Sequence, residues 1–330
     1  MVGHEWAVRL LSEHIANGRT RQAYLFTGPQ GTGRRTLALR FFMALNCQNP
    51  PQPGQICNAC QACRRIEKME HPDLDLVQAE QEGGILVVDQ IRGLQRSLSL
   101  SPYEARFRMG LLLRFEEANI HTANALLKTL EEPAPHVVLV LTAESAESLL
   151  PTIVSRCMVL RLGPVALPTV QESLQSQWGL AAQEATLLAH LSGGRVGYAL
   201  KLHQDSEMMD QRNRWLDEMS NLLKQSRVAR FDYVEKLDKE KDKERTRQML
   251  QVWLSFWRDV MLGASRTAIN VTNLDRAEQI ENIASTIDLN LAVRTVNAIQ
   301  RTIKYLESNV NSRLALEVLA LDLPGIDGRN

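Results

Sequence analysis

The chain has 330 residues, more than one ordinary domain core holds, so we expect two or three domains. Lys plus Arg and Asp plus Glu both number 38. The chain therefore lacks the basic excess typical of a protein that grips DNA alone, and any nucleic-acid role should be shared with partners. No apolar run reaches the ~18 residues that span a membrane, and no signal peptide is evident at the start, so we expect a cytoplasmic protein without a membrane partner and without disulfides.

The first half of the chain alternates short apolar runs with helical stretches. This pattern is typical of an α/β fold with a parallel sheet covered by helices on both faces. The strand signal stops after Gly163-Pro164. Short helices are expected over 172–200, and apolar residues at three-to-four spacing predict helices from about residue 206 onward. The expected strands are residues 24–27, 74–77, 109–113, 137–141 and 158–162.

A glycine-rich turn follows the first expected strand and opens a helix, which is the context of a phosphate-binding loop. Backbone N–H groups at such a helix N-terminus can cradle phosphate. The motif requires Lys and then Ser or Thr after its last glycine, whereas two Arg residues stand here and the Thr comes one residue late. A cation cannot ligate Mg²⁺, so we expect a relic loop without hydrolysis, or one that still binds nucleotide weakly. The loop residues are Gly28, Gly31, Gly33, Arg34, Arg35 and Thr36.

The strand expected over 109–113 shows a second departure. Active enzymes of this type end that strand with paired acids that hold Mg²⁺ and polarise water. Leu113 and Arg114 stand at those positions, and Glu116 and Glu117 come slightly later. Two independent losses at one site argue against catalysis more strongly than either alone.

Four cysteines lie close together, with nine, two and two residues between them. Zn²⁺ prefers four tetrahedral ligands, and four thiolates would leave no position for water. The spacing therefore predicts a structural zinc site held by Cys47, Cys57, Cys60 and Cys63. His71 is a less suitable ligand because of its distance and the Pro that follows it. The alternative is a set of unrelated reduced thiols.

The segment 124–133 reads Asn-Ala-Leu-Leu-Lys-Thr-Leu-Glu-Glu-Pro, and it resembles the signature helix of AAA+ clamp-loader subunits of bacterial DNA polymerase III. By periodicity alone it is a helix stopped by Pro133, with Lys128, Glu131 and Glu132 facing solvent. The resemblance covers residues 1–163 well, and beyond 208 it rests mainly on 314–317 and overall helicity. The other matching segments are 23–29, 71–73, 99–104 and 155–157.

The resemblance implies an AAA+ module followed by a helical collar. In this family a ring-like pentamer opens a sliding clamp and places it on primed DNA, so the implied partners are gamma/tau-type ATPase subunits, a delta subunit, the clamp and primed DNA in the replisome at the nucleoid. Delta-prime-type members often lack an intact loop, as here, so ATP and Mg²⁺ would be held by neighbouring subunits. The implied domains are an AAA+ nucleotide-binding-like domain over 1–163 with a zinc module at about 47–63, a helical lid over 164–207 and an oligomerising collar over 208–330.

Ser155-Arg156-Cys157 is similar to the family's Ser-Arg-Cys motif, whose Arg reaches the ATP site of the neighbouring subunit. The resemblance thus implies that Arg156 acts catalytically in trans, although an Arg alone would be interpreted as the partner of a surface carboxylate. Cys157 is expected to be a packed side chain rather than a ligand.

Two further positions correspond to the family's phosphate sensors. Thr142 follows the strand over 137–141, where a polar sensor is placed, and a structural role for it is equally open. The second sensor is an Arg in active members, and Gly197 stands at its position, with Arg195 out of register.

Two other functions compete with that of a non-hydrolysing subunit. An active gamma/tau-like ATPase conflicts with the residues at the loop and at the strand end. A free zinc-containing nucleic-acid binder conflicts with the zero net charge and with the signature helix.

Overall fold

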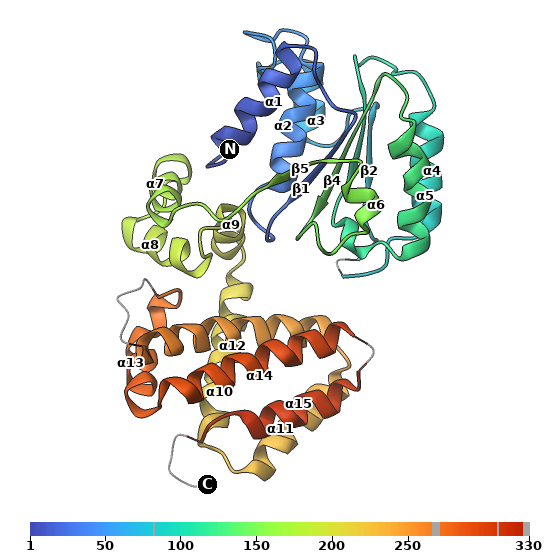
Figure 1. The fold of residues 1–330 in the computed structure, drawn as a ribbon. Helices are drawn as coiled ribbons and strands as arrows, with labels where there is room; N and C mark the ends of the chain where they lie inside the picture. Colours follow the sequence, from blue (N-terminus) through green and yellow to red (C-terminus); the bar gives the residue numbers. More distant parts are fainter. Residues whose placement is uncertain (82, 266–270, 309, 326–330) are drawn as a thin grey trace. The chain divides into compact units, whose positions relative to one another are not determined.

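The computed structural model describes residues 1–81, 83–265, 271–308 and 310–325, and the chain divides into two compact units (Figure 1). The first unit comprises residues 1–173 and 194–198, and the second comprises 174–193 and 199–330. Two helices contribute residues to both units, α7 (Leu167–Trp178) and α9 (Val196–Gln204).

A five-stranded parallel sheet with the order β2-β3-β4-β1-β5 forms the centre of the first unit. All five strands begin and end within two residues of the predicted strands, so the predicted α/β fold class is confirmed. The strands are β1 (Ala23–Thr27), β2 (Leu74–Val77), β3 (Arg108–Leu112), β4 (Val137–Ala143) and β5 (Met158–Arg161).

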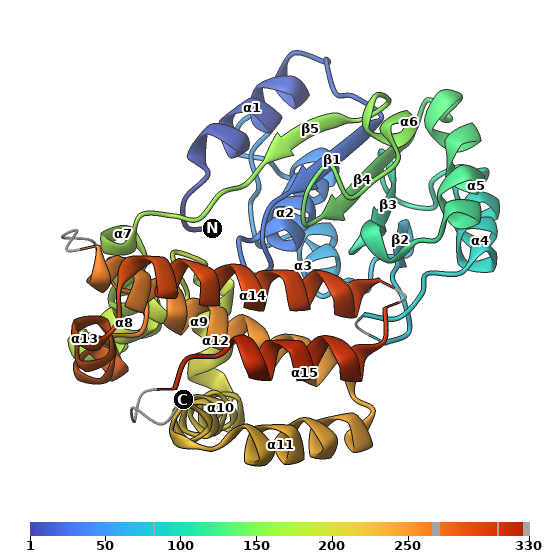
Figure 2. The same ribbon diagram turned by 60° about the horizontal axis from the view of Figure 1, so that its bottom comes forward.

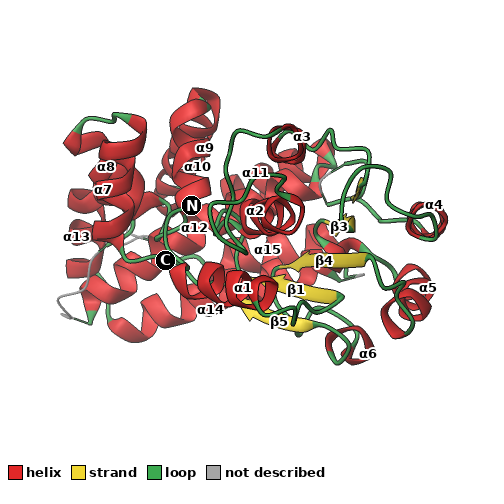
Figure 3. Cartoon of the chain, turned by 90° about the horizontal axis from the view of Figure 1, so that it is seen from above, coloured by secondary structure: helices red, strands yellow, loops and turns green. Residues whose placement is uncertain are grey.

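Helices cover both faces of this sheet because successive strand residues point to opposite sides. Tyr24 and Phe26 of β1 pack into the core on one face, and Leu25 packs into the core on the other. Burial on both faces explains why the strands are continuous apolar runs in the sequence. The first face carries α1 (Glu5–Ala16), α2 (Arg34–Asn46) and α3 (Gln61–Glu67), and the second carries α4 (Val88–Leu98), α5 (Ile120–Glu131) and α6 (Pro151–Val154) (Figure 3).

The described part of the second unit is helical, as the apolar stripes predict. Its core contains the buried aromatic side chains Trp253, Phe256 and Trp257. The helices are α8 (Ala182–Leu191), α10 (Ser206–Lys224), α11 (Arg227–Glu240), α12 (Lys243–Ala264), α13 (Ala277–Thr286), α14 (Leu289–Glu307) and α15 (Ser312–Asp322). Helix α12, the longest of those described, packs against α13 and α14, and α11 packs against α15 (Figure 2).

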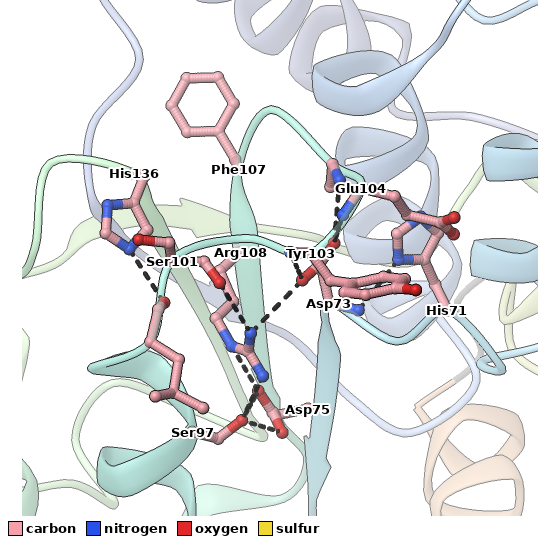
Figure 4. A network of polar contacts seen from close by, with 12 residues as sticks. His71, Asp73, Asp75, Ser97, Ser101, Tyr103, Glu104, Phe107, Arg108 and His136 are labelled. Atoms are coloured by element: carbon pink, nitrogen blue, oxygen red, sulfur yellow. Dashed lines mark hydrogen bonds and ion pairs between the residues drawn. The ribbon is translucent and has the colours of Figure 1, made fainter.

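A polar network joins the N-terminal ends of β2 and β3 (Figure 4). Asp73 is fully buried, and its carboxylate accepts hydrogen bonds from the backbone N–H groups of Tyr103, Glu104 and Ala105 at 2.6, 2.9 and 2.9 Å. The guanidinium of Arg108 lies 3.4 Å from the same carboxylate. Although burial alone would raise it, these backbone donors hold the pKa of Asp73 below its ordinary value. Since ligands of such sheets bind at the carboxyl ends of the strands, we assign this network a structural role.

Asp73→Asn is expected to lower the free energy of unfolding by about 2 kcal/mol, because an amide offers one acceptor oxygen to donors that the carboxylate satisfies with two. The folded pKa lies below the unfolded value of ~3.9, so the stabilisation is present above that value and is lost as the pH falls through the folded pKa. Urea unfolding should therefore show a difference between wild type and variant that shrinks as the solution is acidified.

Asp89→Asn is the control, because Asp89 is an exposed carboxylate on α4 whose ion pair with Arg92 lies at the surface. It should change the free energy of unfolding by less than about 0.5 kcal/mol. An equal loss in both variants would show that the buried hydrogen bonds of Asp73 do not carry the effect.

Candidate functional site

The predicted phosphate loop joins β1 to α2 at the carboxyl edge of the sheet. Its first residue, Gly28, donates its N–H to the carbonyl oxygens of Ala143 and Glu144 at 3.2 and 3.1 Å, so the loop starts against the end of β4. Gly33 precedes α2 with φ 95°. The loop thus has the strand-turn-helix geometry of a phosphate cradle.

Residues 194–198 lie directly against this loop. Gly197 donates its N–H to the carbonyl oxygen of Gly31 at 2.8 Å. A Cβ atom at Gly31, which has φ 87°, would lie 2.7 Å from the backbone nitrogen of Tyr198. Only glycine fits such a conformation and such a close approach. Arg195, the out-of-register candidate for the second sensor, has its guanidinium carbon 4.4 Å from the ring centroid of Tyr198.

The two arginines of the loop differ in their exposure to solvent. Arg34 is 8% exposed, and its Nη1 has no hydrogen-bond partner among the described residues. Burial lowers the pKa of Arg34 and raises the pKa of the neighbouring Glu116. Arg35 and Thr36 are both exposed. A buried guanidinium thus stands where the motif has Lys, and an exposed cation stands where it has the hydroxyl ligand of Mg²⁺.

The residues that follow β3 form structural contacts with β4 and with Glu117. Leu113 is buried, and the next residue, Arg114, has a left-handed backbone with φ 48°. Thr142 accepts a hydrogen bond from the N–H of Arg114 at 3.0 Å, so its hydroxyl joins the ends of β3 and β4. Arg114 also pairs with Glu117 at 2.7 Å. The hydroxyl that the resemblance assigns to a sensor therefore already has a structural contact, and its sensor role stays a prediction.

Arg156 lies in the turn that follows α6, and its side chain is 34% exposed. Its backbone N–H donates to the carbonyl of Ile153 at 3.1 Å, and Ile153 is fully buried. The neighbouring Cys157 packs partly against the same core, where burial raises its pKa to about 12. The motif therefore fixes the backbone of Arg156 while its guanidinium remains accessible.

The guanidinium of Arg156 has two anchors. Nη1 donates to the carbonyl oxygen of Thr152 at 2.9 Å and lies 3.4 Å from the hydroxyl of Ser155. Nη2 lies 2.5 Å from Oε1 of Glu131, at the end of α5. Sequence reasoning missed Glu131, which periodicity placed on the solvent side of its helix. Only the match to a known signature drew attention to that segment.

The four predicted metal ligands come together at the ends of α2 and α3. Cys47 directly follows α2, Cys60 precedes α3, and the four sulfur atoms all lie within 4.8 Å of one another. The Sγ atoms of Cys57 and Cys63 are 4.0 Å apart, close to the ~3.8 Å between ligands of a tetrahedron with Zn–S bonds of about 2.3 Å.

The backbone around these sulfurs suits thiolates. The N–H groups of Ala59 and Cys60 point at the sulfur of Cys57 and lower its pKa to about 6. His71 does not join the cluster, since its Nδ1 accepts a hydrogen bond from the N–H of Asp73 at 3.1 Å and its Nε2 lies 3.5 Å from the carboxylate of Glu104. The cluster can therefore hold a metal ion through four cysteines.

The described helices include none that is both long enough and apolar enough to span a membrane.

Comparison with known proteins gives consistent matches along the chain. Residues 3–166 match the family model described as DNA polymerase III, delta subunit, and residues 206–324 match the model of its C-terminal part. The chain is 30% identical to DNA polymerase III subunit delta' of Bacillus subtilis over 96% of this chain and 94% of that protein. It is 34% identical to the delta' subunit of Pseudomonas aeruginosa over 68% of this chain and 69% of that one. DNA polymerase III subunit tau of Bacillus subtilis is 32% identical over 48% of this chain and 27% of that protein.

Proposed function

This chain belongs to the family of DNA polymerase III delta' subunits, and we propose that it is a non-hydrolysing clamp-loader subunit of the DNA polymerase III holoenzyme. In this proposal it assembles with gamma/tau-type ATPase subunits and a delta subunit. The assembly opens the sliding clamp and places it on primed DNA during replication, in the cytoplasm at the nucleoid. ATP and Mg²⁺ are held by the neighbouring subunits.

The proposal rests on the contrast between the phosphate loop and the Ser155-Arg156-Cys157 motif. At the phosphate loop, Arg35 and Leu113 replace the residue types that hold Mg²⁺. At the motif after α6, Arg156 is fixed at its backbone and accessible at its guanidinium. In this proposal the chain's own nucleotide site is defective, and the chain supplies the group that would complete another subunit's site.

Arg156 would contribute positive charge to the neighbour's ATP. The planar guanidinium can donate two parallel hydrogen bonds to phosphate oxygens. It would stabilise the charge that develops on the transferring phosphoryl group, an effect worth about 10³–10⁵ in turnover where arginine fingers have been removed. Ser155 would support this role as a second contact of Nη1, and Cys157 by packing behind the motif.

We further propose that the cysteine cluster holds one structural Zn²⁺ and that the chain is organised as an AAA+ domain, a lid over 164–207 and a collar from 208. Four thiolates complete the coordination shell, so the metal would hold α2 and α3 together without taking part in the reaction. The collar would supply the contacts that hold the assembly.

The purified chain is expected to show no ATP turnover above background. A Thr or Ser hydroxyl and two acids that the reaction requires are replaced by Arg35, Leu113 and Arg114. Phosphate release from the chain alone, beside a gamma/tau-type subunit as positive control, is the measurement. Turnover that disappears in a Gly33→Val variant would locate hydrolysis in this loop and would support an ATPase subunit instead.

The partner proposal is tested by mixing the chain with purified gamma/tau-type and delta subunits and following assembly by light scattering. A single complex that contains this chain and loads clamp on primed DNA is the expected result. A chain that stays separate while the other subunits assemble would contradict the proposal.

A further inference from the structure

The proposed function leaves unexplained why a carboxylate of the signature helix contacts the finger residue. Glu131 lies at the end of α5 and Arg156 lies after α6, and their side chains meet at 2.5 Å. We infer that Glu131 is a positioning residue, which sets the direction in which the guanidinium of Arg156 projects from the surface. This inference rests on the proposed trans-acting role of Arg156.

The backbone on both sides of the contact is held by the core. Leu126 and Leu130 of α5 and Ile153 of α6 are buried in one apolar cluster, so the two helices have a fixed spacing. The backbone of Arg156 is held in place, but four rotatable bonds separate its Cα atom from the guanidinium. Without lateral contacts such a side chain samples many rotamers, and ordering it costs conformational entropy.

Two contacts remove most of that freedom. The carbonyl of Thr152 accepts from Nη1, and the carboxylate of Glu131 accepts from Nη2. Among the described residues no acceptor contacts the Nε–H of Arg156, and one Nη2–H also remains. A guanidinium has five N–H donors, so holding it from one side still leaves donors for a phosphate.

The contact contributes little to the stability of the fold. The side chains of Arg156 and Glu131 are 34% and 49% exposed, and exposed ion pairs are weak because water and salt screen them. A contact that adds little stability, yet fixes a charged group at the surface, is suited to preorganisation. Donors that are already aimed at the developing charge need no reorganisation during the reaction.

The test is clamp- and DNA-stimulated ATP hydrolysis by the reconstituted complex that carries Glu131→Ala or Glu131→Gln in this chain. Misplacing a catalytic group lowers the rate of the chemical step, so we expect kcat to fall about threefold to tenfold in Glu131→Ala, with KM for ATP within about twofold of wild type. Glu131→Gln keeps a hydrogen-bond acceptor, so its kcat should lie between those of wild type and Glu131→Ala.

Glu132→Gln is the matched control, because it removes the adjacent charge, which makes no hydrogen bond or ion pair in the described chain. It should retain the wild-type kcat. Adding Glu131→Ala to Arg156→Ala should cause no further loss, since Glu131 acts only through Arg156. A purely structural role would instead give additive losses.

Two failures can be told apart. If Arg156→Ala hydrolyses ATP at the wild-type rate, the proposed finger role itself is wrong. If Arg156→Ala is impaired while Glu131→Ala matches wild type, or exceeds it because the carboxylate had restrained the finger, the positioning role is wrong and the finger role stands.

Discussion

Replacing Cys63 with Ser is expected to abolish stoichiometric zinc binding and to destabilise the first unit by at least about 3 kcal/mol, a fraction of the ~10–16 kcal/mol that structural zinc contributes in small zinc modules. Cys63 is fully buried, and the proposed ligands Cys47 and Cys63 belong, together with Ile66, to the core between the sheet and α1–α3. Loss of the metal would therefore loosen α3 and the side of α2 against which it packs. Metal analysis of wild type should give about one zinc per chain.

Cys157→Ser is the matched control, because Cys157 lies outside the cluster of four sulfur atoms. It should keep its zinc. In thermal unfolding, a chelator should lower the midpoint temperature of wild type and of Cys157→Ser. It should leave the midpoint of Cys63→Ser unchanged. Wild-type protein that holds no zinc and is insensitive to the chelator would contradict the metal assignment.

Arg230→Met is expected to destabilise the helical unit by about 3–4 kcal/mol. Arg230 of α11 is 6% exposed. Its N–H groups reach five backbone carbonyls, those of Leu222, Leu223, Ala320, Leu323 and Pro324. These carbonyls lie at, or directly after, the C-terminal ends of α10 and α15, where the helix dipoles favour a cation. One side chain thus holds two helix ends together.

Arg227→Met on the same helix is the control, because Arg227 is exposed and its side chain forms no hydrogen bond or ion pair with the described residues. It should change the free energy of unfolding by less than about 0.5 kcal/mol. Arg230→Lys should recover part of the loss, because an ammonium has three donors in place of five. Equal unfolding curves for Arg230→Met and Arg227→Met would show that the helix-end contacts are dispensable.

The sheet could be predicted because its physical cause is local in the sequence. Strands buried on both faces must be apolar at every position, and the five apolar runs match the five strands. The cysteine cluster could be predicted for a similar reason, since Cys57, Cys60 and Cys63 are close in the chain and only Cys47 is more distant.

Contacts between distant segments could not be predicted in this way. The pair of Glu131 and Arg156 and the approach of Gly197 to Gly31 each depend on the register between elements. Periodicity assigns a charged residue to the exposed face of a helix, but it does not say which other charged residue lies opposite. Arg230 is the clearest case, because a charged residue in a mixed-sign helix gives no sign that it is buried among carbonyls.

The measurement that tests the central claim most directly is the stimulated ATPase and clamp-loading rate of a fully assembled complex with Arg156→Ala in this chain. Folding, zinc content and assembly should match wild type, because the side chain is partly exposed and contributes little to the core. We expect both rates to fall about tenfold or more, with poor rescue by Arg156→Lys, since an ammonium lacks the planar fork. If the assembled Arg156→Ala complex hydrolyses ATP and loads clamps at the wild-type rate, Arg156 does not act in trans.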